Sequence, residues 1–298
     1  MIHRDTVFKI IGSLLFIEVA IMFVCFVMAI GFGEDDEMPF AISIVLTLLT
    51  GIVLRYLGRH SDNTMSRRDA YLVVSLSWVI FSFFGTLPFV ISGYIPSFTD
   101  AYFETMSGFT TTGATILDNV DALPHGLLFW RSMTQWIGGL GIVFFTTAIL
   151  PSFVGGSVKV FAAEATGPIS SKLHPRLSTS AKWIWTVYFL LTLACVLSFM
   201  AFGMGWFDSL NYAMGSTATG GFSTHNDSAE FFRSPAIEYV ATLYCFLAGA
   251  NFTLLYTTAL RRSLKPMWKN AEFKFYLFVV LAFTLFIMIE LMLYNGYD

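Results

Sequence analysis

The sequence predicts an all-α polytopic membrane protein with seven transmembrane helices and two short re-entrant helices. The first observation is the composition: 56% of the residues are hydrophobic and only 12% are charged, with a mean hydropathy of +0.68. Soluble domains carry about 25% charged residues, so this composition excludes that class. The other two observations are a series of long apolar segments and a pair of short segments that each run into a stretch rich in threonine and glycine.

Seven apolar segments are long enough to cross a bilayer. A span needs about 20 apolar residues, because the hydrocarbon core is about 30 Å thick and a helix rises about 1.5 Å per residue. The segments are 8–32, 39–57, 70–92, 126–150, 181–204, 235–260 and 273–294. The first is too long for the apolar region of a signal peptide and has no small-residue cleavage site behind it, so we expect it to be a retained span.

The distribution of charge predicts the orientation of these spans. If the N-terminus is cytoplasmic, all but two of the 17 Lys and Arg residues fall in cytoplasmic segments, and only Arg131 and Arg233 lie toward the other side. Acidic residues gather in the outer segments, for example in the run EDDE at 34–37. Because a bias of Lys and Arg sets the orientation of membrane proteins, we expect a cytoplasmic N-terminus.

Two shorter segments, 99–110 and 207–218, are amphipathic. Each leads into a threonine- and glycine-rich stretch, SGFTTTGAT at 107–115 and GSTATGGFST at 215–224. Apolar stretches of about 10–14 residues are more typical of re-entrant or interfacial pieces than of spans. The charge distribution places both stretches on the outer side. We therefore expect two short helices that enter the membrane from outside without crossing it.

The order of elements repeats along the chain. An offset of 108 residues aligns the two short segments and pairs Asp100 with Asp208, Met106 with Met214, Thr111 with Thr219, and Gly113 with Gly221. A repeat of this length indicates internal duplication. The predicted parts are two leading helices at 1–62, a first span–short helix–span repeat with a cytoplasmic linker at 63–178, a second repeat at 179–268, and the first helix of an incomplete third repeat at 269–298.

The threonine- and glycine-rich stretches have the composition of an ion-selectivity filter. Irregular backbone at membrane depth has to be buried in protein or line a water-filled path. Successive carbonyl groups can replace the hydration shell of a cation, glycine lets the backbone turn them inward, and the preceding helix directs its partly negative C-terminus toward the ion. The predicted ion-binding residues are Thr110, Thr111, Thr112, Gly113, Ala218, Thr219, Gly220 and Gly221. A turn-rich outer loop is the plainer interpretation of one copy, but two copies in register favour the filter.

Two other classes of function are weighed against a cation pore. A secondary carrier could bind an organic anion at the N-termini of half-helices, but here the short helices precede the loops and present their C-termini. An intramembrane enzyme would need a nucleophile and a base together within the spans, yet none of the five histidines lies in the middle of a predicted span. We therefore expect transport and no catalysis.

Three stretches carry a family resemblance: DAYFETMSGFTTTGAT at 100–115, QWIGGLGIVFFTTAILP at 135–151 and GGFSTH at 220–225. Together with the layout of the spans, they resemble the potassium-transporting subunits of the Trk/Ktr/HKT superfamily, most closely the bacterial TrkH family. The resemblance extends over the whole chain, and the first of the three stretches is its most specific part.

The resemblance implies four span–loop–span units in one chain around a single pore, with a key glycine in each filter, here Gly113 and Gly221. It implies uptake of K⁺ across the bacterial inner membrane, with K⁺ as the transported ion and no covalent cofactor. The implied partners are membrane lipid, a second copy in a homodimer of full-length subunits, and a cytoplasmic nucleotide-binding gating subunit of the TrkA type; nucleic acid is not among them.

The chain departs from the family in its number of filters. It carries two filter segments and half of a third unit, so the broken-helix gate that the family places in its third unit and the pore-facing arginine of its fourth are not in this sequence. We expect either the N-terminal portion of a longer chain or a half-transporter that closes its pore between chains. The unpaired span at 273–294 favours the first of these.

A few other features have two interpretations. The glycines at 138–141 suit close helix packing better than a nucleotide loop. Arg131, near the outer end of its span, is expected to snorkel or to pair with Asp118 or Asp121. Glu18, near mid-span, is costly unless it is paired or protonated. The segment 152–180 could dock a gating subunit or lie at the headgroups as a linker.

Cysteines and histidines show no metal-ligand spacing along the chain. We therefore expect no transition-metal site, cysteines that fill apolar cores, and ordinary surface histidines.

Overall fold

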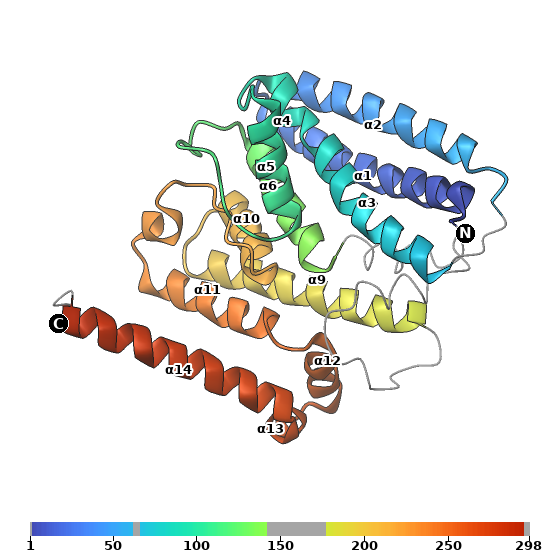
Figure 1. The fold of residues 1–298 in the computed structure, drawn as a ribbon. Helices are drawn as coiled ribbons and strands as arrows, with labels where there is room; N and C mark the ends of the chain where they lie inside the picture. Colours follow the sequence, from blue (N-terminus) through green and yellow to red (C-terminus); the bar gives the residue numbers. More distant parts are fainter. Residues whose placement is uncertain (1, 62–65, 142–176, 295–298) are drawn as a thin grey trace.

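The computed structural model describes residues 2–61, 66–141 and 177–294, and these form helices joined by short connections (Figure 1). The helices are α1 (Arg4–Phe32), α2 (Glu37–Leu57), α3 (Arg67–Gly85), α4 (Leu87–Ser92), α5 (Phe98–Phe109), α6 (His125–Gly139), α9 (Leu177–Ala201), α10 (Trp206–Thr217), α11 (Pro235–Ala248), α12 (Phe252–Arg261), α13 (Lys265–Lys269) and α14 (Ala271–Tyr294), with a 3₁₀ turn at Ser228–Phe232. No strand occurs in these described ranges.

Within the described residues, five helices are long and apolar enough to cross a membrane, or six if the bent pair α11 and α12 counts as one span. The five are α1, α2, the α3–α4 stretch at Arg68–Ser92, the Trp183–Ala201 part of α9, and α14. They match the predicted spans to within a few residues at each end. The predicted span 126–150 begins as α6, and residues 142–150 lie outside the described part of the chain, as does most of the segment 152–180.

The predicted span 235–260 is corrected by the structure, because it is not one straight helix. Helices α11 and α12 meet at an angle of 101°. Asn251 begins α12 as its cap, since its side chain accepts a hydrogen bond from the backbone N–H of Thr253 at 3.0 Å. At the other side of the break, a Cβ atom on Gly249 would lie 2.5 Å from the hydroxyl of Tyr276 in α14. A poor helix former at Gly249 and a strong cap two residues later at Asn251 therefore turn the chain here.

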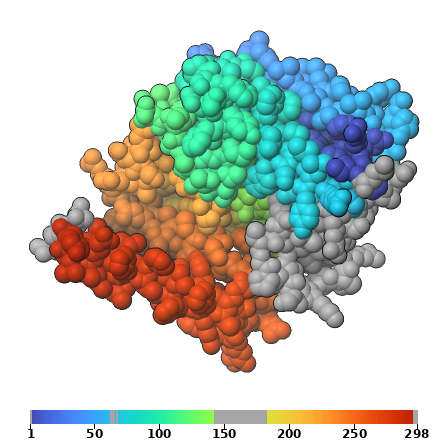
Figure 2. Space-filling model, in the orientation of Figure 1, coloured from blue at the N-terminus to red at the C-terminus, as the bar shows by residue number. Residues whose placement is uncertain are grey.

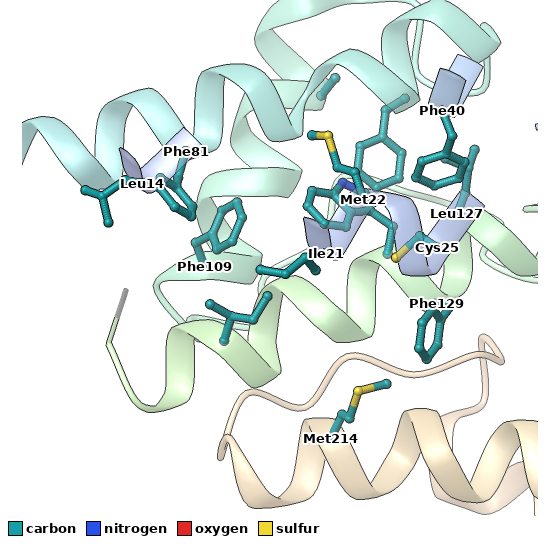
Figure 3. Packing of buried hydrophobic residues seen from close by; sticks show 14 of the residues in the cluster. Leu14, Ile21, Met22, Cys25, Phe40, Phe81, Phe109, Leu127, Phe129 and Met214 are labelled. Atoms are coloured by element: carbon teal, nitrogen blue, oxygen red, sulfur yellow. The ribbon is translucent and has the colours of Figure 1, made fainter. Parts of the chain in front are cut away.

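The leading helices α1 and α2 run side by side and cover one flank of the molecule (Figure 1). Small residues let them approach: a Cβ on Gly12 would lie 2.8 Å from the carbonyl oxygen of Gly51. Side chains of α1, α2, α3, α5 and α6 then form the main apolar core, and Figure 3 shows Met22, Cys25, Phe40, Phe81, Phe109 and Leu127 within it. Met214 of α10 belongs to the same core, so the second repeat is anchored on the first.

The acidic loop between α1 and α2 caps helix α6, which the sequence did not predict. Glu34 accepts a hydrogen bond from the backbone N–H of His125 at 2.6 Å, and buried Asp36 accepts one from the backbone N–H of Leu127 at 3.0 Å. A side chain on Gly126 would collide with the Asp36 carboxylate. Carboxylates at a helix N-terminus satisfy unpaired N–H groups and complement the helix dipole. The loop thereby fixes the N-terminal end of α6 against the leading helices.

Helix α14 lies along the edge of the molecule, where Figure 2 shows it as a separate red ridge. None of the residues in its most apolar window is buried. Only its first turns pack, with Phe273 buried and Tyr276 stacked on Phe246 of α11 at a centroid distance of 5.1 Å. The remaining apolar surface of α14 has the character of a face that meets lipid or further protein.

Candidate functional site: two paired filter segments

The two predicted filter segments have the same backbone conformation. Each follows a helix of 12 residues, α5 or α10, and these helices are offset by 108 positions. In each segment the second residue and the glycine have positive φ angles: 53° and 76° at Thr111 and Gly113, and 55° and 86° at Thr219 and Gly221. A β-branched residue rarely adopts a positive φ. Its presence at matching positions in both segments indicates a conformation that the surrounding structure imposes.

Backbone hydrogen bonds repeat in the same register. In the first segment, three successive backbone N–H groups donate to carbonyls of α5, each at 2.9 Å: Thr110 to Met106, Thr111 to Gly108 and Thr112 to Ser107. In the second segment, the equivalent N–H groups donate to carbonyls of α10 at 3.0 to 3.2 Å: Ala218 to Met214, Thr219 to Ser216 and Gly220 to Gly215. The N–H groups are therefore used by the last turn of the preceding helix. Within the described part of the chain, no carbonyl oxygen of 110–113 or 218–221 accepts a hydrogen bond. The segments thus offer free carbonyl oxygens, the groups that coordinate a dehydrated cation.

The two segments touch each other at their glycines. A Cβ atom on Gly113 would overlap the carbonyl oxygen of Gly220 in the other segment, whereas a Cβ on Gly221 would have no atom within 4 Å. Gly113 is therefore required both by its positive φ and by this contact, while Gly221 is required by its φ alone. The structure therefore brings the two predicted filter segments into contact at Gly113 and Gly220.

Helix α6 contacts the second predicted filter segment through Gln135, a residue that was not predicted to belong to the site. The buried side chain of Gln135 accepts a hydrogen bond from the backbone N–H of Phe222 at 3.0 Å, directly after the second segment. Because that N–H must meet an oxygen, the Nε2 group faces the other way, and it has no partner among the described residues. A lone glutamine in an apolar span was the signal that could have identified this residue.

Close packing explains two of the glycines at 138–141. A side chain on Gly138 would collide with the carbonyl oxygen of Phe109, and a Cβ on Gly139 would lie 2.8 Å from the Cα of Ala218. Helix α6 therefore approaches the backbone at the end of both short helices, and the interpretation of close helix packing is confirmed at these two positions.

Arg131 is buried, and the expectation that it pairs with Asp118 or Asp121 is wrong. Its Nη2 lies 2.8 Å from Oε1 of Glu104, with only 2% and 0% of the two side chains exposed. Glu104 lies in α5 and Arg131 in the first half of α6, so the packing of these two helices brings the charges together. The pair adds a buried charge–charge contact beside Thr115 and Ile116, which follow the first predicted filter segment.

A second contact joins the loops that follow the two predicted filter segments. Asp121 lies 2.7 Å from Nδ1 of His225, and the backbone N–H of Val120 donates to Oδ1 of Asn226 at 2.7 Å. The hydrogen bond from His225 holds the pKa of Asp121 below its usual range. His225 therefore links two loops, which corrects the expectation of an ordinary surface histidine. Among the described residues, no group of three or more His, Cys, Asp or Glu side chains has a metal-binding arrangement.

Two matched short helices, each followed by a loop whose carbonyl oxygens accept no hydrogen bond in the described part of the chain, lie among helices long and apolar enough to cross a membrane, so the chain is of the multi-pass membrane protein class. The chain belongs to the TrkH family: the family described as cation transport protein matches residues 36–295.

Individual relatives share the fold and much of the sequence. The chain is 35% identical to the Trk system potassium uptake protein TrkH of Salmonella typhimurium, over 99% of this chain and 62% of that protein. It is 33% identical to TrkG of Escherichia coli, over 94% of this chain and 58% of that protein. The crystal structure of the potassium transporter TrkH from Vibrio parahaemolyticus superposes with a TM-score of 0.84 at 32% identity, covering 100% of this chain and 61% of the other. The chain thus spans about three fifths of the length of these relatives.

Proposed function

We propose that this chain contributes half of the selectivity filter of a pore that takes up K⁺ across the bacterial inner membrane. The observation that carries the proposal is the pair of matched segments whose carbonyl oxygens accept no hydrogen bond within the described part of the chain. In this assignment the oxygens of Thr110 to Gly113 and of Ala218 to Gly221 line the ion path. The relatives that the chain resembles are named potassium uptake proteins, which supports K⁺ as the ion.

The electrostatics of the two segments favour a cation. Helices α5 and α10 end at the segments, so the partial negative charge at each C-terminus is directed toward the ion. The acids Asp100 and Asp208 stand in the first turn of each helix, on the predicted outer side, where negative charge raises the local concentration of cations. An organic anion would meet the wrong end of both helices.

The assembly and orientation follow from the same proposal. The leading helices, the two repeats and the beginning of a third unit would occupy 1–62, 63–178, 179–268 and 269–298, with the N-terminus in the cytoplasm and α5 and α10 re-entrant from outside. Further units, in the same polypeptide or in another chain, would close the pore. A homodimer of full-length subunits and a cytoplasmic nucleotide-binding subunit of the TrkA type are the proposed partners, in keeping with relatives that are named as parts of a Trk system.

Uptake by the complete natural polypeptide tests this function. In bacteria that lack their own K⁺ uptake systems, it should restore growth at low K⁺ and import radioactive rubidium. Gly113→Asp and Gly221→Asp should abolish both while leaving the amount of membrane-inserted protein unchanged. The matched control is Gly93→Asp: Gly93 also has a positive φ, 78°, with no atom near a Cβ, but it ends α4 outside the filter.

Two results would contradict the proposal. One is normal rubidium uptake by both filter variants. The other is uptake of a labelled dicarboxylate without rubidium, which would favour a secondary carrier instead.

A further inference from the structure

The outer ends of the two filter segments are held by groups at equivalent positions with different chemistry. In the first repeat the hydroxyl of Thr115 donates to the carboxylate of Glu104 at 3.0 Å. In the second repeat the hydroxyls of Tyr212 and Ser223 are hydrogen-bonded at 2.6 Å. An offset of 108 relates both positions of the first pair to those of the second. The duplicated contact is therefore present in both repeats, but it is charged in the first and neutral in the second.

Arg131 extends the charged contact across to the second repeat. Its Nε donates to Oε1 of Glu104 at 2.8 Å, and its Nη1 donates to the backbone carbonyl oxygen of Ser223 at 3.0 Å. The guanidinium carbon also lies 4.2 Å from the centre of the Phe222 ring. Through Arg131, the residues that follow the first segment are tied to the residues that follow the second.

Stability alone does not account for this arrangement. Replacing a buried ion pair by apolar residues of similar volume is often neutral or stabilising, because desolvation offsets the attraction between the charges. What the pair provides is a fixed geometry for the groups that it contacts. The planar guanidinium holds its acceptors in fixed positions, and the Glu104 carboxylate, which also accepts from the backbone N–H of Ile116 at 3.0 Å, cannot rotate freely.

Resting on the function proposed above, we propose that Glu104 and Arg131 form a positioning pair that sets the separation of the two filter segments and so the preference of the pore for K⁺ over Na⁺. Cation selectivity depends on the number and positions of the coordinating carbonyls. The segments already touch at Gly113 and Gly220. Because one end of each segment is fixed by its helix, a shift at the other end moves the carbonyls that lie between.

Selectivity in reconstituted membranes tests the pair. The complete natural polypeptide is placed in lipid vesicles, and uptake of radioactive rubidium and sodium is measured for the native protein, Arg131→Lys and the double variant Glu104→Gln with Arg131→Met. Lysine keeps the buried charge but loses the planar fork, and the double variant leaves no unpaired charge, so both are expected to fold. We expect the rubidium-to-sodium ratio to fall about tenfold, the scale of one lost hydrogen bond to a charged group.

A remote, buried carboxylate with a hydrogen-bonded partner supplies the matched control. Asp69 is buried and lies 2.7 Å from Nδ1 of His3, in the part of the chain predicted to face the cytoplasm. Asp69→Asn should lower the thermal stability without changing the ratio. A second readout does not depend on transport. It compares the concentrations of K⁺ and of Na⁺ that give half-maximal stabilisation of the purified protein against heat. These two concentrations should become more similar in Arg131→Lys and in the double variant than in the native protein.

Each outcome is decisive. An unchanged ion ratio in both variants, at whatever rate, together with unchanged K⁺ and Na⁺ stabilisation, would overturn the positioning role and leave the pair purely structural. Failure of the native protein to take up rubidium would instead contradict the proposed function itself. An equal loss of selectivity in Asp69→Asn would show that general destabilisation, and not this pair, changes the ratio.

Discussion

Gly113 in the first filter segment lies against the carbonyl oxygen of Gly220 in the second, so closely that a side chain at position 113 would overlap that oxygen. This contact makes the two segments one unit. It also makes the two key glycines unequal, because Gly221, at the position equivalent to Gly113, faces open space.

Alanine at the two glycines should therefore have different effects. Gly221→Ala should cost about 1–2 kcal/mol, the strain of a left-handed conformation for a residue with a Cβ atom. Gly113→Ala adds the overlap with the Gly220 backbone, so it should destabilise the protein more and reduce uptake more strongly. Thermal unfolding of the purified polypeptide and rubidium uptake measure both effects. Equal losses in the two variants would show that the segments do not touch at this point.

Gln135 should be needed for the second filter segment. Gln135→Leu leaves the buried N–H of Phe222 without an acceptor, which costs about 1–3 kcal/mol and should lower rubidium uptake. The control is the adjacent Thr134→Val, because the Thr134 hydroxyl donates only to a carbonyl of its own helix, that of Arg131, at 2.6 Å. If the two variants lose the same stability and the same uptake, Gln135 is no more than a packing residue.

Asp36 should make stability depend on pH in an unusual direction for a carboxylate. Burial raises its pKa, against the opposing effect of the hydrogen bond from the Leu127 N–H. Because the folded protein then holds the proton more tightly than the unfolded chain, this contribution to stability is present at acid pH and is lost as pH rises through the raised pKa.

Comparing the midpoint of thermal unfolding between the native protein and Asp36→Asn from pH 4 to pH 8 checks this sign, over a range that begins near the usual Asp pKa of about 3.9. We expect the midpoint of Asp36→Asn to rise relative to that of the native protein as the pH rises. If instead the midpoint of the native protein rises relative to that of Asp36→Asn with rising pH, the Asp36 cap on α6 acts mainly through its charge.

Much of the architecture could be predicted because it depends on local information. The length of an apolar segment indicates whether it can span a membrane. The short helices α5 and α10 begin and end within one residue of the predicted segments 99–110 and 207–218. The two loops that carry the eight residues proposed as the filter could also be located in advance, since they follow those helices at a fixed offset. Hydropathy, however, does not report what interrupts a helix, so the bend between α11 and α12 was missed.

The sequence by itself determined that the protein is a helical, multi-pass membrane protein, and it determined the positions of most long apolar helices and of the two matched short helices. Each of these depends on a window of adjacent residues or on a repeated pattern. Only the tertiary structure decided which polar groups meet behind the filter. Gln135 and Phe222 are 87 positions apart, and Arg131 is 92 from Ser223. The sequence contains several acids that could pair with Arg131. Its partner is Glu104, because the close approach of α6 to α5 removes water from these two side chains and fixes their geometry.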